Sequence, residues 1–244
     1  MPSVHSSPRA YGARKCARFL ITIALKDQCH LAAFKSHTGF TATGDLMTYS
    51  IIGSGNIGSA LARQFARTGI SVAIANLRGP DSLQLLKKEL GEHIVPQTIE
   101  AALTANTVIL AVPFTAVSAI ARSSREWNGK LVVDATNAID FPSYAPTDLG
   151  GRLSSELVTE HLRGARVVKA FNTLPAAVLA ADPAEGHGRR VIFVSGNDIE
   201  ANAEVAGLVE KLGFAPIILG KLKEGGLLQQ YGGPLVIQNL VKIG

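Results

Sequence analysis

The chain has 244 residues, of which 47% are hydrophobic and 18% are charged, so it can bury the core of one α/β domain. Its formal net charge of +5 lies mostly in residues 1–46, which hold six Lys or Arg against two Asp, and the remainder is almost neutral. Because the remainder is almost neutral, we do not expect nucleic-acid binding. No apolar run approaches the roughly 18 residues that cross a bilayer, so we do not expect membrane insertion either.

The first 46 residues differ from the rest in cysteine content. Cys16 and Cys29, the only cysteines of the sequence, both lie there, so disulfides cannot cross-link the remainder. A body without disulfides is typical of a reducing, cytoplasmic setting. Met47 stands directly before the first predicted strand. We therefore expect residues 1–46 to be an N-terminal extension that is disordered or not part of the fold; a targeting peptide and additional structure are the alternatives.

From Met47 onward, short apolar runs alternate with helical patterns. The apolar runs predict strands at 49–52, 71–75, 107–112, 131–135, 165–171, 190–195 and 215–219. The helical patterns predict helices at 57–67, 82–90, 154–162 and 201–212, each shortly before a glycine that can end a helix. The runs are continuous rather than alternating, which is typical of strands covered on both faces. Residues 47–244 are therefore predicted to form a single α/β domain with a Rossmann-type, doubly wound, mostly parallel sheet and an exposed loop at 180–190.

A glycine-rich turn, GSGNIG, follows the first predicted strand and opens the first predicted helix. This is the context in which a G-x-G-x-x-G motif binds a dinucleotide. Gly53 allows the tight turn, Gly55 lets the backbone approach a pyrophosphate, and Gly58 allows close packing of helix on strand. The free N–H groups at the start of the helix face the phosphates. The predicted cofactor-binding residues of this turn are Gly53, Ser54, Gly55, Asn56, Ile57 and Gly58.

The end of the second predicted strand decides between the two nicotinamide cofactors. An NAD site usually has Asp or Glu there, which accepts hydrogen bonds from the ribose 2′-hydroxyl. This chain has Asn76 instead, followed by Arg78, whose guanidinium can pair with a 2′-phosphate. We therefore predict that residues 47–244 form an NADP(H)-binding domain. The alternative is that Arg78 is a solvated turn residue and the cofactor selectivity is weak.

Six short stretches, which together span about residues 48–236, carry a resemblance to a known family. They are YSIIGSGNIGSALA, NLRGPDSL, AVPF, VVDATN, VVKAFNTLPA and LQQYGGPL. On these stretches the chain resembles the NADP oxidoreductases that reduce or oxidise the deazaflavin coenzyme F420, together with their relatives of unassigned substrate. Members commonly carry Ser, whose hydroxyl can meet the 2′-phosphate, where this chain has Leu77. The resemblance implies hydride transfer between NADP(H) and a deazaflavin, a flavin or a similar planar acceptor.

Further site residues are predicted where later strands end, because open α/β sheets bind ligands at the carboxyl ends of their strands. The resemblance places Val112, Pro113 and Phe114 beside the cofactor, and a pure packing role is the alternative. Asn137 can hydrogen-bond the nicotinamide carboxamide or can form only an Asx turn. Asp134 is a candidate general base, but we expect its carboxylate to organise the loop that follows.

Candidate contacts of the acceptor come from two stretches. They are Phe171, Asn172 and Thr173 after the strand predicted at 165–171, and Gly232 and Gly233 near the end of the chain. A role in loop structure is the equal alternative for the first three. The two glycines belong to the segment QQYGGP (229–234), which we expect to close over the cavity and to let backbone approach the acceptor.

No catalytic residue is assigned, since the sequence shows no nucleophile, triad or metal-binding cluster. Lys169 is unusual in a strand, because lysine is rarely buried unpaired, but we give it no catalytic role. The favoured function is an NADP-dependent oxidoreductase that positions two rings, with coenzyme F420 or a flavin as co-substrate. A Rossmann-class dehydrogenase or imine reductase acting on a small carbonyl or imine, and a non-catalytic NADPH-sensing protein, are the alternatives. The expected partner is a small-molecule acceptor, and a homodimer is left open.

Overall fold

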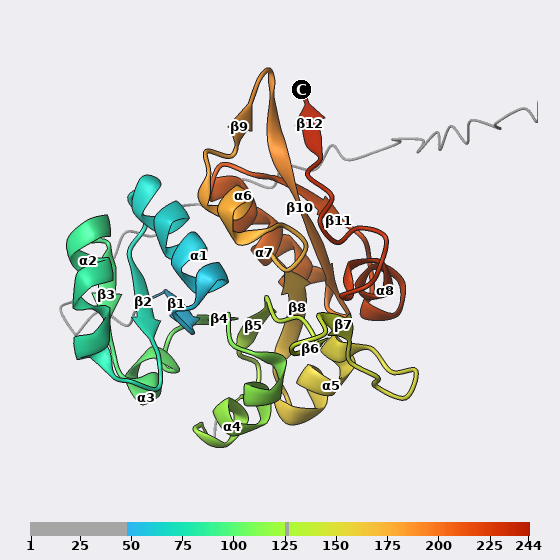
Figure 1. The fold of residues 1–244 in the computed structure, drawn as a ribbon, viewed down its shortest axis with the longest axis horizontal. Coiled ribbons are helices and arrows are strands. Elements are labelled where there is room, and N and C mark those ends of the chain that lie inside the picture. The colour runs from blue at the N-terminus through green and yellow to red at the C-terminus, as the bar shows by residue number, and fades with distance from the viewer. Residues whose placement is uncertain (1–47, 125–126) are drawn as a thin grey trace, which may run out of the picture. The chain divides into compact units, whose positions relative to one another are not determined.

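The computed structural model describes residues 48–124 and 127–244, which form a single α/β domain built on one central sheet (Figure 1). The strands follow one another in the sheet in the order β3-β2-β1-β4-β5-β8-β10-β11. Their bounds are β1 Tyr49–Ile52, β2 Val72–Ala75, β3 Ile94–Pro96, β4 Thr107–Leu110, β5 Leu131–Asp134, β8 Arg166–Ala170, β10 Gly188–Gly196 and β11 Ala215–Ile218. The prediction of an extension over residues 1–46 lies outside the described residues.

Helices cover both faces of this sheet (Figure 1). Their bounds are α1 Asn56–Arg67, α2 Gln84–Leu90, α3 Ile99–Ala102, α4 Val117–Arg122, α5 Ser154–His161, α6 Ala176–Ala180, α7 Ile199–Lys211 and α8 Leu227–Gln229. The four predicted helices correspond to α1, α2, α5 and α7, and the other four are too short to give a helical pattern in the sequence. The prediction of a Rossmann-type, mostly parallel sheet is confirmed.

Successive residues of each central strand enter two different hydrophobic cores. In β1, Ile51 packs in the core that contains Leu61 and Phe65 of α1, whereas Ile52 packs in the core that contains Ile120 of α4 and Val158 of α5. All of these side chains are buried. A strand that is covered on both faces needs apolar residues at every position, which is why the predicted strands read as continuous apolar runs.

Short and reversed strands are where the structure departs from the prediction. β3 was not predicted, because its three residues carry too little pattern, and the same holds for β12 (Val241–Ile243). β10 runs antiparallel to β8, although β11 is again parallel to β10. The predicted exposed loop at 180–190 is instead a β-hairpin, in which β9 (Ala184–Glu185) pairs with the start of β10. β12 pairs with the same part of β10.

The strand order places an open crevice beside β1. Both neighbours of β1, which are β2 and β4, run parallel to it, and the chain crosses from one side of β1 to the other between them. Ligands of doubly wound sheets bind at this reversal, outside the carboxyl ends of the strands. The segments that leave β1, β4 and β5 therefore meet at one edge of the sheet and form the walls of the candidate site.

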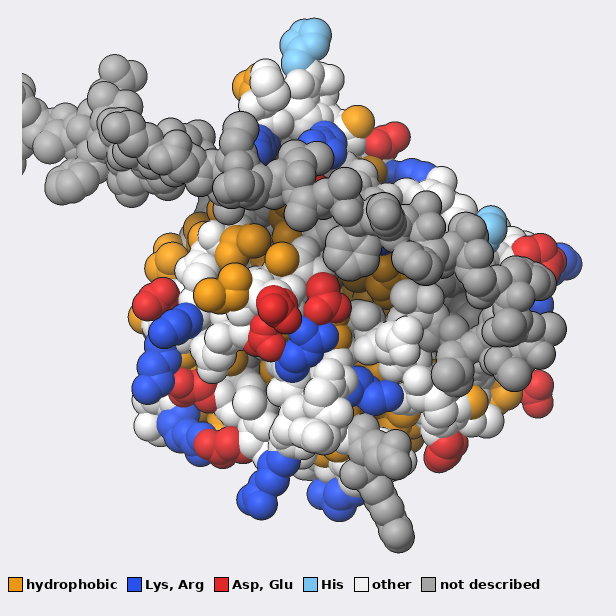
Figure 2. Space-filling model, turned by 180° about the vertical axis from the view of Figure 1, so that it is seen from behind, with side chains coloured by type: hydrophobic (Ala, Val, Ile, Leu, Met, Phe, Trp, Pro, Cys, Tyr) orange, Lys and Arg blue, Asp and Glu red, His pale blue; other side chains and the backbone are white. Residues whose placement is uncertain are grey.

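Acidic and basic side chains of the described residues lie side by side on one face of the molecule. On the face drawn in Figure 2, the blue and red side chains of the described residues are interspersed. This agrees with the nearly neutral charge of the body. None of the helices formed by residues 48–124 and 127–244 is long and apolar enough to span a membrane.

Candidate functional site

Two of the three motif glycines of the turn after β1 are required by the local geometry, and the third leaves open space in front of the backbone. Gly53 has φ +110°, and a Cβ there would lie 2.2 Å from the carbonyl oxygen of Ala111. A Cβ on Gly58 would lie 2.0 Å from the carbonyl oxygen of Gly53, so α1 can pack on the turn only without a side chain there. A Cβ on Gly55 would meet no protein atom within 4 Å and would project into open space. Gly53 thus allows the tight turn and Gly58 the close packing that the motif needs, and the space in front of Gly55 is open to a ligand.

The start of α1 is free to meet an anion. Gly55 is the residue that precedes the helix, so it offers no side chain to cap it, and α1 has no acidic residue in its first turn. The first N–H groups of a helix have no partner inside the helix, and they carry a partial positive charge. The residues present therefore fit a dinucleotide whose pyrophosphate lies against Gly55, Asn56 and Ile57.

The turn after β2 is built by the Asn76 side chain. Its amide donates to the Ser54 hydroxyl at 2.8 Å and to the Ser82 hydroxyl at 3.0 Å, while its oxygen accepts from the Arg78 backbone N–H at 2.8 Å. Asn76 therefore ties this turn to the glycine turn rather than remaining free for a ligand. Leu77 is 85% exposed and Arg78 is also exposed, with no guanidinium partner among the described residues.

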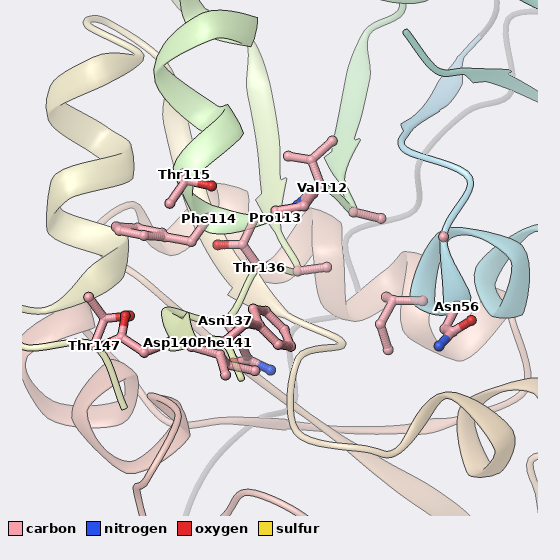
Figure 3. A pocket seen from close by; sticks show the side chains of 15 residues that line it. Asn56, Val112, Pro113, Phe114, Thr115, Thr136, Asn137, Asp140, Phe141 and Thr147 are labelled. Carbon is pink, nitrogen blue, oxygen red and sulfur yellow. The ribbon is translucent and has the colours of Figure 1, made fainter. Parts of the chain in front are cut away.

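The crevice beside the glycine turn holds a pocket of about 570 Å³ (Figure 3). Its walls come from the glycine turn, from the segment after β4, and from the segment that runs from the end of β5 through the hairpin of β6 (Ile139–Asp140) and β7 (Ala145–Pro146). The lining residues are Gly55, Asn56, Ile57, Ala111, Val112, Pro113, Phe114, Thr115, Ala135, Thr136, Asn137, Ile139, Asp140, Phe141 and Thr147. A pocket of this size, mostly apolar with a few polar groups, is typical of small-molecule sites.

Asn137 is the polar side chain in the middle of this pocket (Figure 3). Its amide donates to the carbonyl oxygen of Asn172 at 2.9 Å, and its oxygen accepts from the Asn172 amide, also at 2.9 Å. One N–H and one lone pair of Asn137 remain available. Asn137 is therefore held in place and can still bind a carboxamide, so the structure supports more than an Asx turn at this position.

The predicted acceptor contacts lie behind the pocket rather than in it. Phe171, Asn172 and Thr173 are at most 3% exposed, and none of them lines the pocket. Gly232 has φ +86°, and its Cβ would lie 2.7 Å from Pro146 of the β6–β7 hairpin. Gly233 donates to the carbonyl oxygen of Gln230 in a tight turn. None of these five residues lines the pocket, and their contact with the acceptor stays a prediction.

A buried ion pair lies directly below the pocket floor. Asp134 accepts from Lys169 at 3.1 Å, from Ser155 at 2.7 Å, and from both the backbone and the hydroxyl of Thr136. Burial raises the pKa of the Asp134 carboxyl, but Lys169 and these hydrogen bonds outweigh burial, so the pKa lies below its ordinary value. The Lys169 ammonium also donates to the Thr136 carbonyl at 3.2 Å. Asp134 therefore organises the loop that follows β5, as expected, and Lys169 is its paired counter-ion.

The sequence interpretation missed the far end of the pocket. Thr115 follows Phe114 directly, and Ile139, Asp140, Phe141 and Thr147 belong to a hairpin of two-residue strands. Strands this short carry no periodic signal. The only hint was their position shortly after Asn137, where the chain leaves β5 at the ligand-binding edge.

Comparison with known proteins identifies the family. The model of the family described as "NADP oxidoreductase coenzyme F420-dependent" matches residues 48–138. A solved structure, hypothetical protein SMa0349 from Sinorhizobium meliloti, is 54% identical, covers 80% of this chain and 96% of its own, and has a TM-score of 0.78. Another, from Arthrobacter sp. FB24, has the provisional name F420-dependent NADP-reductase; it is 29% identical, covers 72% of this chain and 86% of its own, and has a TM-score of 0.59. The chain belongs to this family.

Membership of the F420-dependent NADP oxidoreductase family confirms the resemblance that the sequence motifs indicated. Similarity also extends to larger proteins. Metalloreductase STEAP3 of Rattus norvegicus is 27% identical over 172 residues, which are 70% of this chain and 33% of that protein. The chain thus spans little more than a third of the length of the curated relatives that it matches.

Proposed function

We propose that this chain binds NADP(H) in the crevice at the carboxyl ends of β1, β4 and β5 and transfers a hydride between the nicotinamide and a planar acceptor, such as a deazaflavin or a flavin. The observation that carries this proposal is the open space in front of Gly55, at the uncapped start of α1. A backbone that can be approached so closely, beside free helix N–H groups, suits a pyrophosphate. The family to which the chain belongs is described as NADP-dependent.

Each wall of the crevice has a binding or orienting role in this proposal. The start of α1 holds the pyrophosphate, and Arg78 pairs with the 2′-phosphate from the turn after β2. Asn137 orients the carboxamide with its remaining donor and acceptor. Val112 and Pro113 form an apolar wall that excludes water beside the nicotinamide ring. When bound, NADPH would give up a hydride, which carries two electrons and one proton, and the second proton of the reduced acceptor would come from water.

A glycine replacement tests where the cofactor binds. Gly55→Ala should fold normally, because the added Cβ meets no protein atom and Gly55 has φ −73°, which alanine adopts freely. The methyl group would stand where the pyrophosphate approaches, so we expect the Kd for NADPH to rise by about 10-fold or more. The matched control is Gly207→Ala in α7, where a Cβ also meets no atom; it should bind NADPH as the unaltered chain does. Unchanged NADPH affinity in Gly55→Ala would place the pyrophosphate elsewhere.

A labelling experiment tests the reaction. With NADPH deuterated at the transferred position, an uncharged deazaflavin should gain the label at its acceptor carbon, as measured by mass spectrometry. A deazaflavin is the right probe because a carbon keeps the label, whereas a flavin nitrogen exchanges it with water. Transfer without label would show that the hydride does not pass directly. Failure to oxidise NADPH with any deazaflavin, flavin or quinone would count against the oxidoreductase and for an NADPH-sensing role.

A further inference from the structure

The pocket is arranged along one direction, from the glycine turn to the β6–β7 hairpin. In Figure 3, Asn56 lies at one end and Asp140 and Thr147 lie at the other, with Val112, Pro113, Thr136 and Asn137 between them. If the pyrophosphate binds at Asn56 and the nicotinamide near Asn137, as proposed above, the far end receives the acceptor. The inference below rests on that assignment and concerns the far end alone.

The far end carries one negative charge and no positive charge. Asp140 is the one ionisable side chain among the lining residues, which include no Lys, Arg or His. One oxygen of Asp140 accepts from the Thr147 hydroxyl at 2.8 Å, which fixes the carboxylate at the pocket wall. Among the described residues Asp140 has no salt-bridge partner. An anionic group entering here meets repulsion and finds no counter-charge.

The remaining surface of the far end is aromatic. Phe114 comes from the segment after β4 and Phe141 from the turn that follows β6. Phe141 is 68% exposed, which is unusual for a large apolar ring, and its ring meets Tyr144 edge-on at 5.2 Å between centroids. An exposed aromatic ring beside a pocket offers a flat, apolar face on which a planar ligand can stack.

We propose that the far end accepts a planar ring whose own substituents carry no anionic group. Uncharged flavins and deazaflavins are then preferred over their phosphorylated forms. Phe114 and Phe141 bind the ring, and Asp140 selects against a nearby phosphate or carboxylate. Coenzyme F420 carries a phosphodiester and carboxylates on its side chain, so this pocket suits its uncharged ring-and-ribityl core better than the complete coenzyme.

Riboflavin and FMN provide a matched pair of probes, because they differ by one phosphate. Their binding to the full-length protein saturated with NADP⁺ can be measured by fluorescence, without any turnover. We expect riboflavin to bind about 5-fold more tightly than FMN, the size of effect that one like charge exerts at an exposed site. Asp140→Asn keeps the acceptor for Thr147 and removes only the charge, so it should reduce this preference to less than about 2-fold. Glu210→Gln, an equal change of charge on the exposed side of α7, should leave the preference unchanged.

Two results would overturn the inference. FMN that binds as tightly as riboflavin to the unaltered protein would show that the far end does not discriminate by charge, and this comparison needs no variant. A riboflavin preference that survives Asp140→Asn, in a protein with an unchanged melting temperature, would assign it to another residue. Neither result concerns NADPH oxidation. The proposed function can therefore be correct even if the inferred preference for uncharged acceptors is wrong. Conversely, a chain that oxidises no NADPH would fail the proposed function whatever flavin it binds.

Discussion

Arg78 is the side chain best placed to recognise the 2′-phosphate of NADP(H). Its backbone N–H is fixed by Asn76, while its guanidinium is exposed and meets no described partner. The neighbouring Leu77 is 85% exposed and offers no side-chain hydrogen bond, so in the proposed function recognition of the phosphate would depend on Arg78 more heavily than in a turn with Ser at that position.

Replacing Arg78 with alanine should therefore remove most of the preference for NADPH over NADH. A charge-assisted hydrogen bond is worth roughly 1.5–3 kcal/mol, so the Kd for NADPH should rise about 10-fold or more while the Kd for NADH changes little. Titration calorimetry with both cofactors measures this. Arg163→Ala, which removes another exposed arginine away from the pocket, is the control. If Arg78→Ala keeps the preference, Arg78 is only a turn residue.

The Asp134–Lys169 pair should make stability depend on pH in the acid range. The folded-state pKa of Asp134 lies below its ordinary value, so its ionised form stabilises the fold above that value. This contribution is lost as pH falls through the folded-state pKa. The free energy of unfolding, from urea titrations, should therefore be nearly constant from about pH 7 to 5 and fall below about pH 4.

Replacing only Asp134 should cost more stability than replacing both Asp134 and Lys169. Asp134→Asn leaves the Lys169 charge buried without its partner, which typically costs about 3–5 kcal/mol. The double variant with Lys169→Met removes that stranded charge and should recover part of the loss. A double variant whose loss equals the sum of the two single losses would show that the two side chains do not interact.

The segment around α8 supports the pocket from behind. Gln229 is fully buried, its side chain bonds to Ser195 and Phe193 in β10, and its carbonyl oxygen accepts from Asn172 at 2.7 Å. Asn172 in turn holds Asn137, so one chain of hydrogen bonds joins the segment after β11 to the middle of the pocket. Gln229 of the segment QQYGGP thus reaches the site through Asn172, and closure of this segment over the cavity stays a prediction.

Asn172→Ala tests this support, because it removes the donor to both Asn137 and Gln229. We expect a loss of about 1–3 kcal/mol in stability, the usual cost of buried polar groups left unpaired. The nicotinamide half of NADPH should bind about 10-fold more weakly, since Asn137 keeps its bond to the Asn172 backbone carbonyl but loses the bond that fixes its side-chain oxygen. The control ligand is 2′,5′-ADP, which lacks that half and should bind unchanged. Equal weakening of both ligands would indicate a general loss of structure.

Long apolar strands and the glycine turn could be predicted from the sequence, because each carries a local pattern. The antiparallel β10 could not, since an apolar run does not reveal its direction. Phe171 and Thr173 are candidate acceptor contacts because they leave a strand at the ligand-binding edge, with loop structure as the equal alternative, and both are buried. Asp140 and Phe141 were missed because a two-residue strand leaves no periodicity. Among the residues that line the pocket, the sequence thus predicted those of the glycine turn, those after β4 and Asn137, and missed those of the β6–β7 hairpin.

Taken together, the domain consists of two hydrophobic cores that share one sheet. Side chains of a strand point alternately to the two faces, so each strand contributes to both cores. In β1, Ile51 belongs to the same core as Ile109, its register partner in β4, whereas Ile52 belongs to the other core.

This alternation has a consequence for how mutational effects combine. Ile51→Val and Ile52→Val should each cost about 0.5–1.5 kcal/mol, and their double variant should lose the sum, because peptide-bonded neighbours share no packing partners here. Ile51 and Ile109 are 58 positions apart in the sequence. The stability loss of the double variant Ile51→Val with Ile109→Val should nevertheless differ from the sum of the two single losses, since one enlarged cavity replaces two separate ones. Thermodynamic cycles from urea unfolding measure both. In a sheet that is buried on both faces, residues adjacent in sequence should therefore be energetically independent. Residues that are distant in sequence but paired across strands should be coupled.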